Sequence, residues 1–123
     1  MGLSQLLNSV EHYSSTNAGT GSVTLGALVN TNSLTMAEAG ATNGQPYVFR
    51  FDNSDGDFEI TRCTYNSAGP SVTRDTVLVS KIAGVAGTGK INVITTTTCR
   101  VVLTAEDAIT RQAALSRGWL VGG

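Results

Sequence analysis

The stretch that decides the fold is YVFRFDNSDGDFEITR, residues 47–62. Tyr47–Phe51 alternates aromatic residues with others, which places Tyr, Phe and Phe on one face of an extended strand. Asn53–Gly56 has the composition of a tight turn, in which Gly56 can adopt a positive φ angle without a Cβ penalty. In Phe58–Arg62, apolar and polar residues alternate again, as expected for a second strand that returns alongside the first. The stretch therefore predicts a β-hairpin.

Further β-rich segments lie on both sides of this hairpin, joined by turns rich in Gly, Ser, Thr and Asn. The chain reverses at Gly69-Pro70, and the glycine-rich segment 84–89 is expected to be a flexible loop. Strands are expected within residues 22–29, 72–82, 91–94 and 99–103, with a weaker one at Leu34 and Met36 and a bulge at Gly26. This order predicts an all-β fold, a small antiparallel sandwich or barrel.

The two ends of the chain lack the alternating pattern of the β-rich middle. Residues 1–9 carry leucines at helical spacing in a segment too short for a stable lone helix, so we expect an arm. Thr104 suits an N-cap, and Gly118 suits the C-terminal cap of a short helix from about Ala105 to Arg117. The expected organisation is an N-terminal arm at 1–9, a β-domain at 10–103, and a C-terminal helix and tail at 104–123.

Apolar side chains gather in both of these ends. Leaving the only tryptophan and its aliphatic neighbours in water would forgo several kcal/mol of burial, at about 25 cal/mol per Å². We expect them to contact neighbouring subunits, and the alternative is that they fold back on their own sheet. The expected interface residues are Leu3, Leu6, Leu7, Trp119, Leu120 and Val121.

Composition narrows the classes of function. Among 123 residues there are 8 basic and 9 acidic side chains, so the formal net charge of -1 provides no field to attract nucleic acid. No apolar run reaches the roughly 18 residues that span a membrane. One histidine and two cysteines offer few ligands or nucleophiles. We therefore expect no catalytic residue, cofactor, metal, nucleic-acid partner, membrane contact or small-molecule substrate.

One motif resembles a phosphate-binding loop. The segment GVAGTGK, residues 84–90, matches its first seven positions, but Ile91 stands where a Ser or Thr should bind magnesium. The residues that follow favour a strand where the motif needs a helix. A mobile hairpin loop explains the segment better.

An acidic group lies at the tip of the central hairpin. Asp52, Asp55, Asp57 and Glu59 suggest calcium, but an EF-hand with Gly56 as its loop glycine would need ligands at positions that hold Phe and Arg. Polar turn residues are the favoured explanation, and a looser surface ion site is the alternative.

The remaining reactive side chains are sparse. Cys63 and Cys99 lie in expected strands, so a disulfide is conceivable, but buried cysteines in a cytoplasmic product usually behave as small hydrophobes. His12 lies in an expected connector, where neither Ser14 nor Ser15 is held by a nucleophile elbow. The sequence therefore offers no persuasive active site.

The order of strands and turns resembles a β-rich structural protein family of tailed bacteriophage virions. The likeness covers about residues 10–103. Its motifs are VEHYSSTNAGTGSVTL at 10–25, YVFRF at 47–51, FEITRCTY at 58–65, VTRDTVLVS at 72–80 and RVVL at 100–103. Phe58 stands where the family usually has Trp, and Arg62 and Cys63 stand where small residues are common.

This resemblance implies a non-enzymatic structural subunit of a tailed phage particle, in the tail or the head-tail region. Its partners would be other virion proteins and copies of itself in a multimer, assembled in the host cytoplasm. A capsid decoration protein or head-fibre base is the first alternative, and a module that binds host glycans is the second. An enzyme is the least favoured class.

Overall fold

The computed structural model describes residues 10–102, and all of its regular elements are β-strands. In chain order they are β1 (Glu11–Ser14), β2 (Val23–Leu28), β3 (Pro46–Asp52), β4 (Phe58–Asn66), β5 (Ser71–Ile82), β6 (Val85–Gly87) and β7 (Thr98–Val101). The all-β prediction is confirmed.

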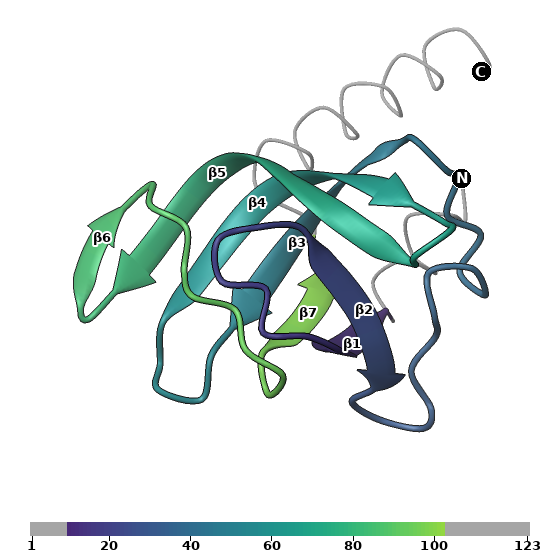
Figure 1. Ribbon diagram of the computed structural model, residues 1–123, viewed down its shortest axis with the longest axis horizontal. Coiled ribbons are helices and arrows are strands. Elements are labelled where there is room, and N and C mark those ends of the chain that lie inside the picture. The colour runs from purple at the N-terminus through teal and green to yellow at the C-terminus, as the bar shows by residue number, and fades with distance from the viewer. Residues whose placement is uncertain (1–9, 103–123) are drawn as a thin grey trace, which may run out of the picture.

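Six of these strands close into an antiparallel barrel. The sheet runs β2-β1-β7-β3-β4-β5, and β5 pairs again with β2, which completes the ring (Figure 1). β6 lies outside the ring and pairs with the far end of β5, so that the two strands form a projecting ribbon. Of the two architectures that the sequence allowed, the chain therefore adopts the barrel.

The central hairpin forms as predicted. β3 and β4 pair from Pro46↔Thr64 to Asp52↔Phe58 without a break in register. Gly56 has a φ of 99° at the turn, in the region where glycine is tolerated best. Because Phe51 lies opposite Glu59, the interior face of β4 carries polar as well as apolar side chains.

The core lies inside the ring. Phe49 and Phe51 project into it from β3 and stack with their ring centroids 5.8 Å apart. Burying each such side chain contributes roughly 1.5–3 kcal/mol. The other large buried apolar side chains are Val10, Val23, Leu25, Met36, Tyr65, Val72, Ile91, Val93 and Val101.

Bulges let the strands curve around this core. The β1–β2 register passes from His12↔Leu28 to Ser14↔Leu25, so β2 has one extra residue at Gly26 and Ala27. This confirms the bulge expected at Gly26. β5, which is twelve residues long, is irregular at two places against β4 and bends visibly (Figure 1).

Three local predictions were wrong. Leu34 and Met36 form no strand. Leu34 makes an isolated bridge to Val10, and Met36 lies in a turn, where Thr35 and Glu38 bond each other's backbone N–H in a capping box. Val85–Gly87 is a paired strand, although a loop was expected. Residues 91–94 form no strand, because their backbone groups bond to Glu59 and to Gly19 instead of a neighbouring strand.

The predicted arm at residues 1–9 and the predicted helix and tail at 104–123 lie outside the described residues. The expected interface residues lie there too: Leu3, Leu6, Leu7, Trp119, Leu120 and Val121.

Candidate functional site

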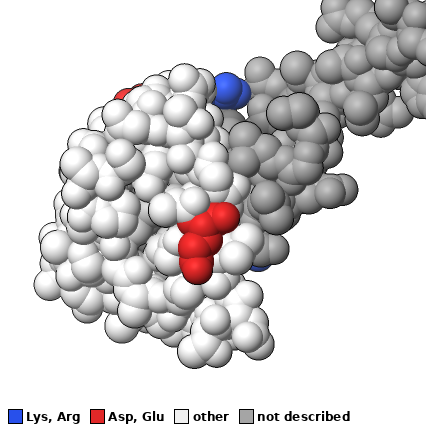
Figure 2. All heavy atoms as spheres, turned by 90° about the vertical axis from the view of Figure 1, so that its right-hand side faces the viewer, with Lys and Arg blue, Asp and Glu red and all other residues white. Residues whose placement is uncertain are grey.

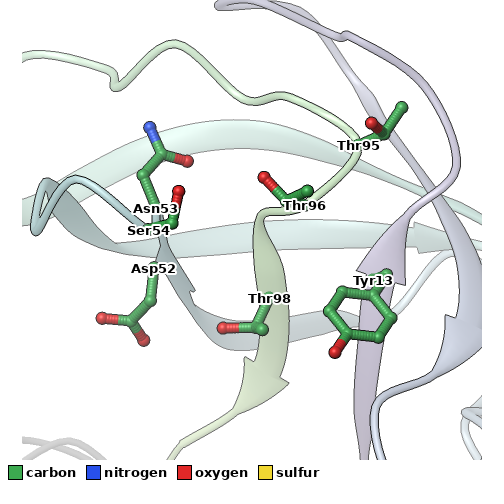
Figure 3. Close-up of a pocket in the computed structure, with 7 residues that line it drawn as sticks. All are labelled: Tyr13, Asp52, Asn53, Ser54, Thr95, Thr96 and Thr98. Atoms are coloured by element: carbon green, nitrogen blue, oxygen red, sulfur yellow. The ribbon is translucent and has the colours of Figure 1, made fainter.

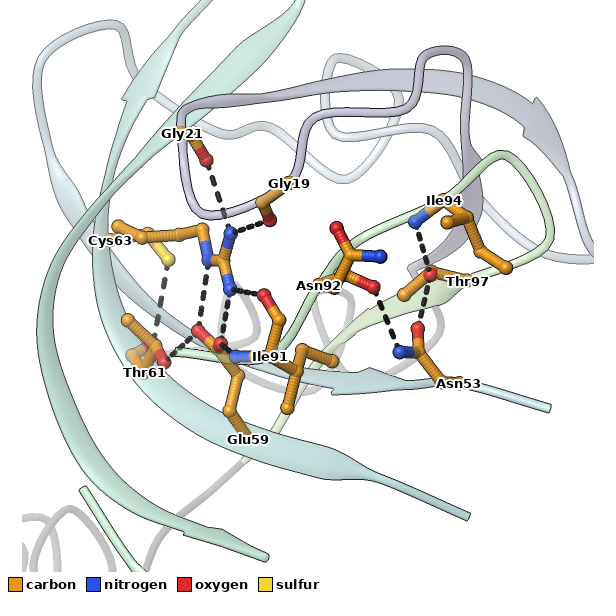
Figure 4. Close-up of polar contacts among 11 residues, drawn as sticks. Gly19, Gly21, Asn53, Glu59, Thr61, Cys63, Ile91, Asn92, Ile94 and Thr97 are labelled. Atoms are coloured by element: carbon orange, nitrogen blue, oxygen red, sulfur yellow. Dashed lines mark hydrogen bonds and ion pairs between the residues drawn. The ribbon is translucent and has the colours of Figure 1, made fainter. Parts of the chain in front are cut away.

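A buried ion pair lies inside one end of the barrel. Arg74 on β5 and Glu59 on β4 are both fully shielded from solvent. The Arg74 Nε donates to Glu59 Oε2 at 3.0 Å, and Nη2 donates to Oε1, so the two groups meet through two parallel bonds (Figure 4). Arg74 also lies 5.5 Å from the ring centroid of Phe51. The pair therefore has the forked geometry that makes arginine–carboxylate contacts strong.

Every hydrogen-bonding position of this pair is occupied. The remaining Arg74 N–H groups donate to the carbonyl oxygens of Gly19 at 2.8 Å, Gly21 at 3.2 Å and Ile91 at 2.8 Å. Glu59 also accepts from the Ile91 N–H at 2.8 Å and from the Thr61 hydroxyl. The five donors of the guanidinium and both carboxylate oxygens are thus satisfied within the chain.

The pair joins segments that are far apart in the sequence. Gly19 and Gly21 lie between β1 and β2, and Ile91 lies between β6 and β7. These two connections also bond directly, because Gly19 and Val93 exchange backbone hydrogen bonds of 3.0 and 2.9 Å. Arg74 and Glu59 therefore fasten the loops that cover this end of the barrel. With no donor or acceptor left over, the pair is suited to holding structure and not to binding a substrate.

Both cysteines are buried and free. Cys63 and Cys99 make no disulfide, which agrees with the favoured interpretation of small hydrophobes. Burial raises the pKa of the Cys99 thiol to about 12. Burial, reinforced by the charge of Glu59, also raises the pKa of Cys63. Neither thiol therefore has the lowered pKa that marks a reactive cysteine.

His12 lies in β1 and not in a connector, which corrects the sequence-based expectation. Its side chain is only 2% exposed, and Nδ1 donates to the Gly26 carbonyl at 2.9 Å. Its buried Nε2 makes no hydrogen bond to the described residues. The Ser14 hydroxyl donates to the Thr16 carbonyl at 2.7 Å instead of contacting His12. The histidine and serine pairing that nucleophilic catalysis requires is therefore not formed here.

The acidic side chains of the hairpin tip are dispersed. Glu59 points into the barrel, Asp52 binds Arg50, and Asp57 accepts from the Ala83 N–H at 2.9 Å. Asp55 accepts from the Asp57 N–H at 2.9 Å, as turn residues commonly do. Within residues 10–102 no group of three or more His, Cys, Asp or Glu side chains could hold a metal ion.

A pocket opens on the outer face of the barrel, and most of its exposed lining surface is apolar. Tyr13, Thr98 and Asp52 lie side by side on β1, β7 and β3, because Thr98 pairs with both of the others. With residues of two adjoining loops they line a cavity of about 530 Å³ (Figure 3). The loop residues are Asn53, Ser54, Thr95 and Thr96.

Hydrogen bonds fix the loop behind this pocket. The Asn53 Nδ2 donates to the Asn92 carbonyl at 2.9 Å, and the Thr97 hydroxyl donates to the Asn53 Oδ1 (Figure 4). The Ile94 N–H donates to the Thr97 Oγ1 at 2.9 Å, and the Thr95 N–H donates to the Asn17 Oδ1 at 3.1 Å. The loop that carries Thr95 and Thr96 is therefore held on both sides.

Comparison with family models, curated proteins and solved structures finds no match to this chain. No helix among residues 10–102 is long and apolar enough to cross a membrane. The face in Figure 2 carries few charged side chains on its described part.

Sequence reasoning missed both the ion pair and the pocket. Glu59 and Arg74 each lie within a strand, and a charged residue at an interior-facing position is a signal of a buried pair. Recognising it required knowing which face of each strand is interior. The pocket combines three strands that are remote in sequence, and only the cross-strand register brings them together.

Proposed function

We propose that the protein is a non-enzymatic structural subunit of a tailed bacteriophage particle, in the tail or head-tail region, that assembles as a multimer. The observation that carries this proposal is the filled interior of the barrel. Packed side chains fill the inside of the barrel, and the hydrogen-bonding groups of the buried Arg74–Glu59 pair all bond to groups of the same chain. Such an interior supports a rigid module that works through its outer surface.

The β5–β6 ribbon offers a surface for contact between subunits. Val79 is 39% exposed and Val85 is 72% exposed, although both are large apolar residues. Among the described strands β6 pairs with β5 alone, so one of its edges has free backbone groups. An open edge of this kind can add to a strand of a neighbouring protein. The resemblance to phage structural proteins supports the same function.

Mass spectrometry of purified particles tests membership of the virion. We expect peptides of this chain in particles of the phage that encodes it, at many copies per particle. Its absence from infectious, gradient-purified particles would refute the proposal. Gold labelling of a tagged chain then locates the subunit by electron microscopy, and label on the capsid would favour the decoration or head-fibre alternative.

Variants test how the subunit is attached. Deleting residues 119–123 should reduce incorporation into particles if Trp119 and its neighbours contact another subunit. Unaltered incorporation would contradict that contact, whereas loss of folding would indicate packing on the chain's own sheet. Val85→Ser, on the β6 edge, should lower multimer formation without affecting the barrel, and Thr73→Ser on the exposed part of β5 is the matched control.

A further inference from the structure

We propose that the pocket of Tyr13, Thr98 and Asp52 binds a neutral carbohydrate. The proposal concerns the barrel surface alone and does not depend on membership of a virion. The pocket volume of about 530 Å³ falls within the roughly 300–1,000 Å³ of small-ligand sites. Because the pocket is open to solvent, it suits one or two units of a longer sugar chain that continues into water.

The groups that line the pocket match the chemistry of a sugar ring. A pyranose has an apolar C–H face and a rim of hydroxyls that both donate and accept. Tyr13, 36% exposed, offers an aromatic surface for the apolar face. Hydroxyls of Ser54, Thr96 and Thr98 can pair with the rim as donors or acceptors.

Asp52 provides the strongest acceptor in the pocket. Its two oxygens share the Arg50 Nε, at 3.0 and 2.9 Å, which orients the carboxylate and leaves acceptor positions on both oxygens. Arg50 is itself held 4.3 Å from the ring centroid of Phe58. A carboxylate that is oriented in this way can accept from two neighbouring sugar hydroxyls through charge-assisted bonds.

The charge of the lining selects a neutral ligand. Asp52 carries the one carboxylate among the lining residues, and none of these residues is basic, so the lining offers no cationic group to bind the carboxylate of an anionic sugar. The lining provides too few carboxylates to form a metal site. Because Asn53 and Thr97 already fix the adjoining loop, little order has to be gained on binding.

Titration followed by NMR tests the proposal with the full chain labelled with ¹⁵N. The probes are methyl glycosides of glucose, galactose, mannose, N-acetylglucosamine and rhamnose, with the methyl glycoside of sialic acid as the acidic comparator. We expect at least one neutral glycoside to shift the amide signals of Tyr13, Asn53 and Thr96 at concentrations up to about 50 mM, which reaches millimolar Kd values. The sialic acid glycoside should leave them unchanged.

Two variants with a matched control separate binding at the pocket from binding elsewhere. Asp52→Asn should weaken binding of the active glycoside about tenfold by removing charge-assisted bonds, and Tyr13→Ala should weaken it by a similar factor. Asp75→Asn removes an exposed carboxylate that binds the Thr64 hydroxyl on β4, and it should leave the affinity unchanged. The proposal is wrong if no neutral glycoside shifts these signals, if only sialic acid does, or if Asp52→Asn binds as tightly as the parent chain.

Discussion

Arg74 and Glu59 are the residues whose replacement should affect stability most. Arg74→Met keeps much of the side-chain volume but leaves the Glu59 carboxylate buried without its partner. We expect the free energy of unfolding to fall by about 3–5 kcal/mol, the usual loss when one half of a buried pair is removed. Urea unfolding followed by far-UV circular dichroism measures this change.

A double variant is the control for this prediction. Arg74→Met combined with Glu59→Leu removes both charges, so no uncompensated carboxylate remains in the barrel. Well-packed apolar replacements of buried pairs are often neutral or stabilising. The double variant should therefore be more stable than Arg74→Met alone. An additive loss in the double variant would contradict the role assigned to the pair.

The buried thiols predict how stability depends on alkaline pH. The pKa of Cys99 is raised from 9.0 to about 12 and that of Cys63 is raised too, so the folded chain keeps protons that the unfolded chain releases above pH 9. A raised pKa contributes stability below the unfolded value and loses it as pH rises towards the folded value. The free energy of unfolding should therefore decrease from pH 9 upward.

Urea titrations at pH 8, 9 and 10 measure this slope. The variant with Cys63→Ala and Cys99→Ala should show a shallower decrease with pH than the parent chain. Some decrease will remain, because burial also raises the pKa of Tyr65. Equal slopes for the two proteins would rule out the thiols as its cause.

At the scale of elements, the β1–β2 bulge depends on Gly26. A Cβ added there would lie 3.0 Å from the Ser15 Cβ and 3.1 Å from the Cα and N of Ser15, the residue that follows β1. Gly26→Ala should therefore destabilise the fold by about 1–3 kcal/mol, the range for overpacking. Thermal unfolding by calorimetry detects this as a lower Tm.

Gly87 in β6 is the matched position. A Cβ at Gly87 meets nothing within 4 Å, so Gly87→Ala should leave the Tm nearly unchanged. The steric interpretation of the bulge would be wrong if Gly26→Ala were as stable as Gly87→Ala.

Which elements the sequence predicts depends on how local their pairing is. The β3–β4 hairpin was predicted because its turn and both strands lie within twenty residues or so of one another. Val85–Gly87 was missed because glycine-rich composition favours a loop, and pairing with β5 overrides it. Residues 91–94 have β-branched side chains, but their backbone partners are Glu59 and Gly19. Those partners are remote, so no local pattern identifies them.

For the whole molecule, the closure of the ring lies beyond sequence reasoning. A sandwich and a barrel use the same alternating strands, and the difference here is one contact between β2 and β5. That contact consists of the pairs Val23↔Val72 and Thr24↔Ser71, whose partners are separated along the chain by β3 and β4. The residues that line the pocket also lie far apart in the sequence, and so do the residues that surround the ion pair. For the molecule as a whole, composition and periodicity predicted the all-β class but not the choice between sandwich and barrel.

The same closure makes a prediction about local stability. The β2–β5 seam has two residue pairs, whereas β4 pairs with β5 along nine. We expect amide hydrogen exchange, measured by mass spectrometry, to be faster at Val23–Thr24 than in the centre of β4, because fewer contacts must break locally. Equal protection in the two places would mean that the ring opens only by global unfolding.

The saturated pair at the closed end of the barrel also constrains how this chain can diverge. A substitution of Arg74 or Glu59 alone leaves the charge of the other residue buried without a partner. A lineage that replaces one of the two residues must therefore replace the other soon afterwards. The two positions should therefore be inherited as a unit and covary in descendants of this gene. Descendants that retain Arg and Glu at these positions should keep the hydrogen bonds that hold residues 19–21 against residue 91. Descendants in which both residues are apolar should hold these two segments together through other contacts.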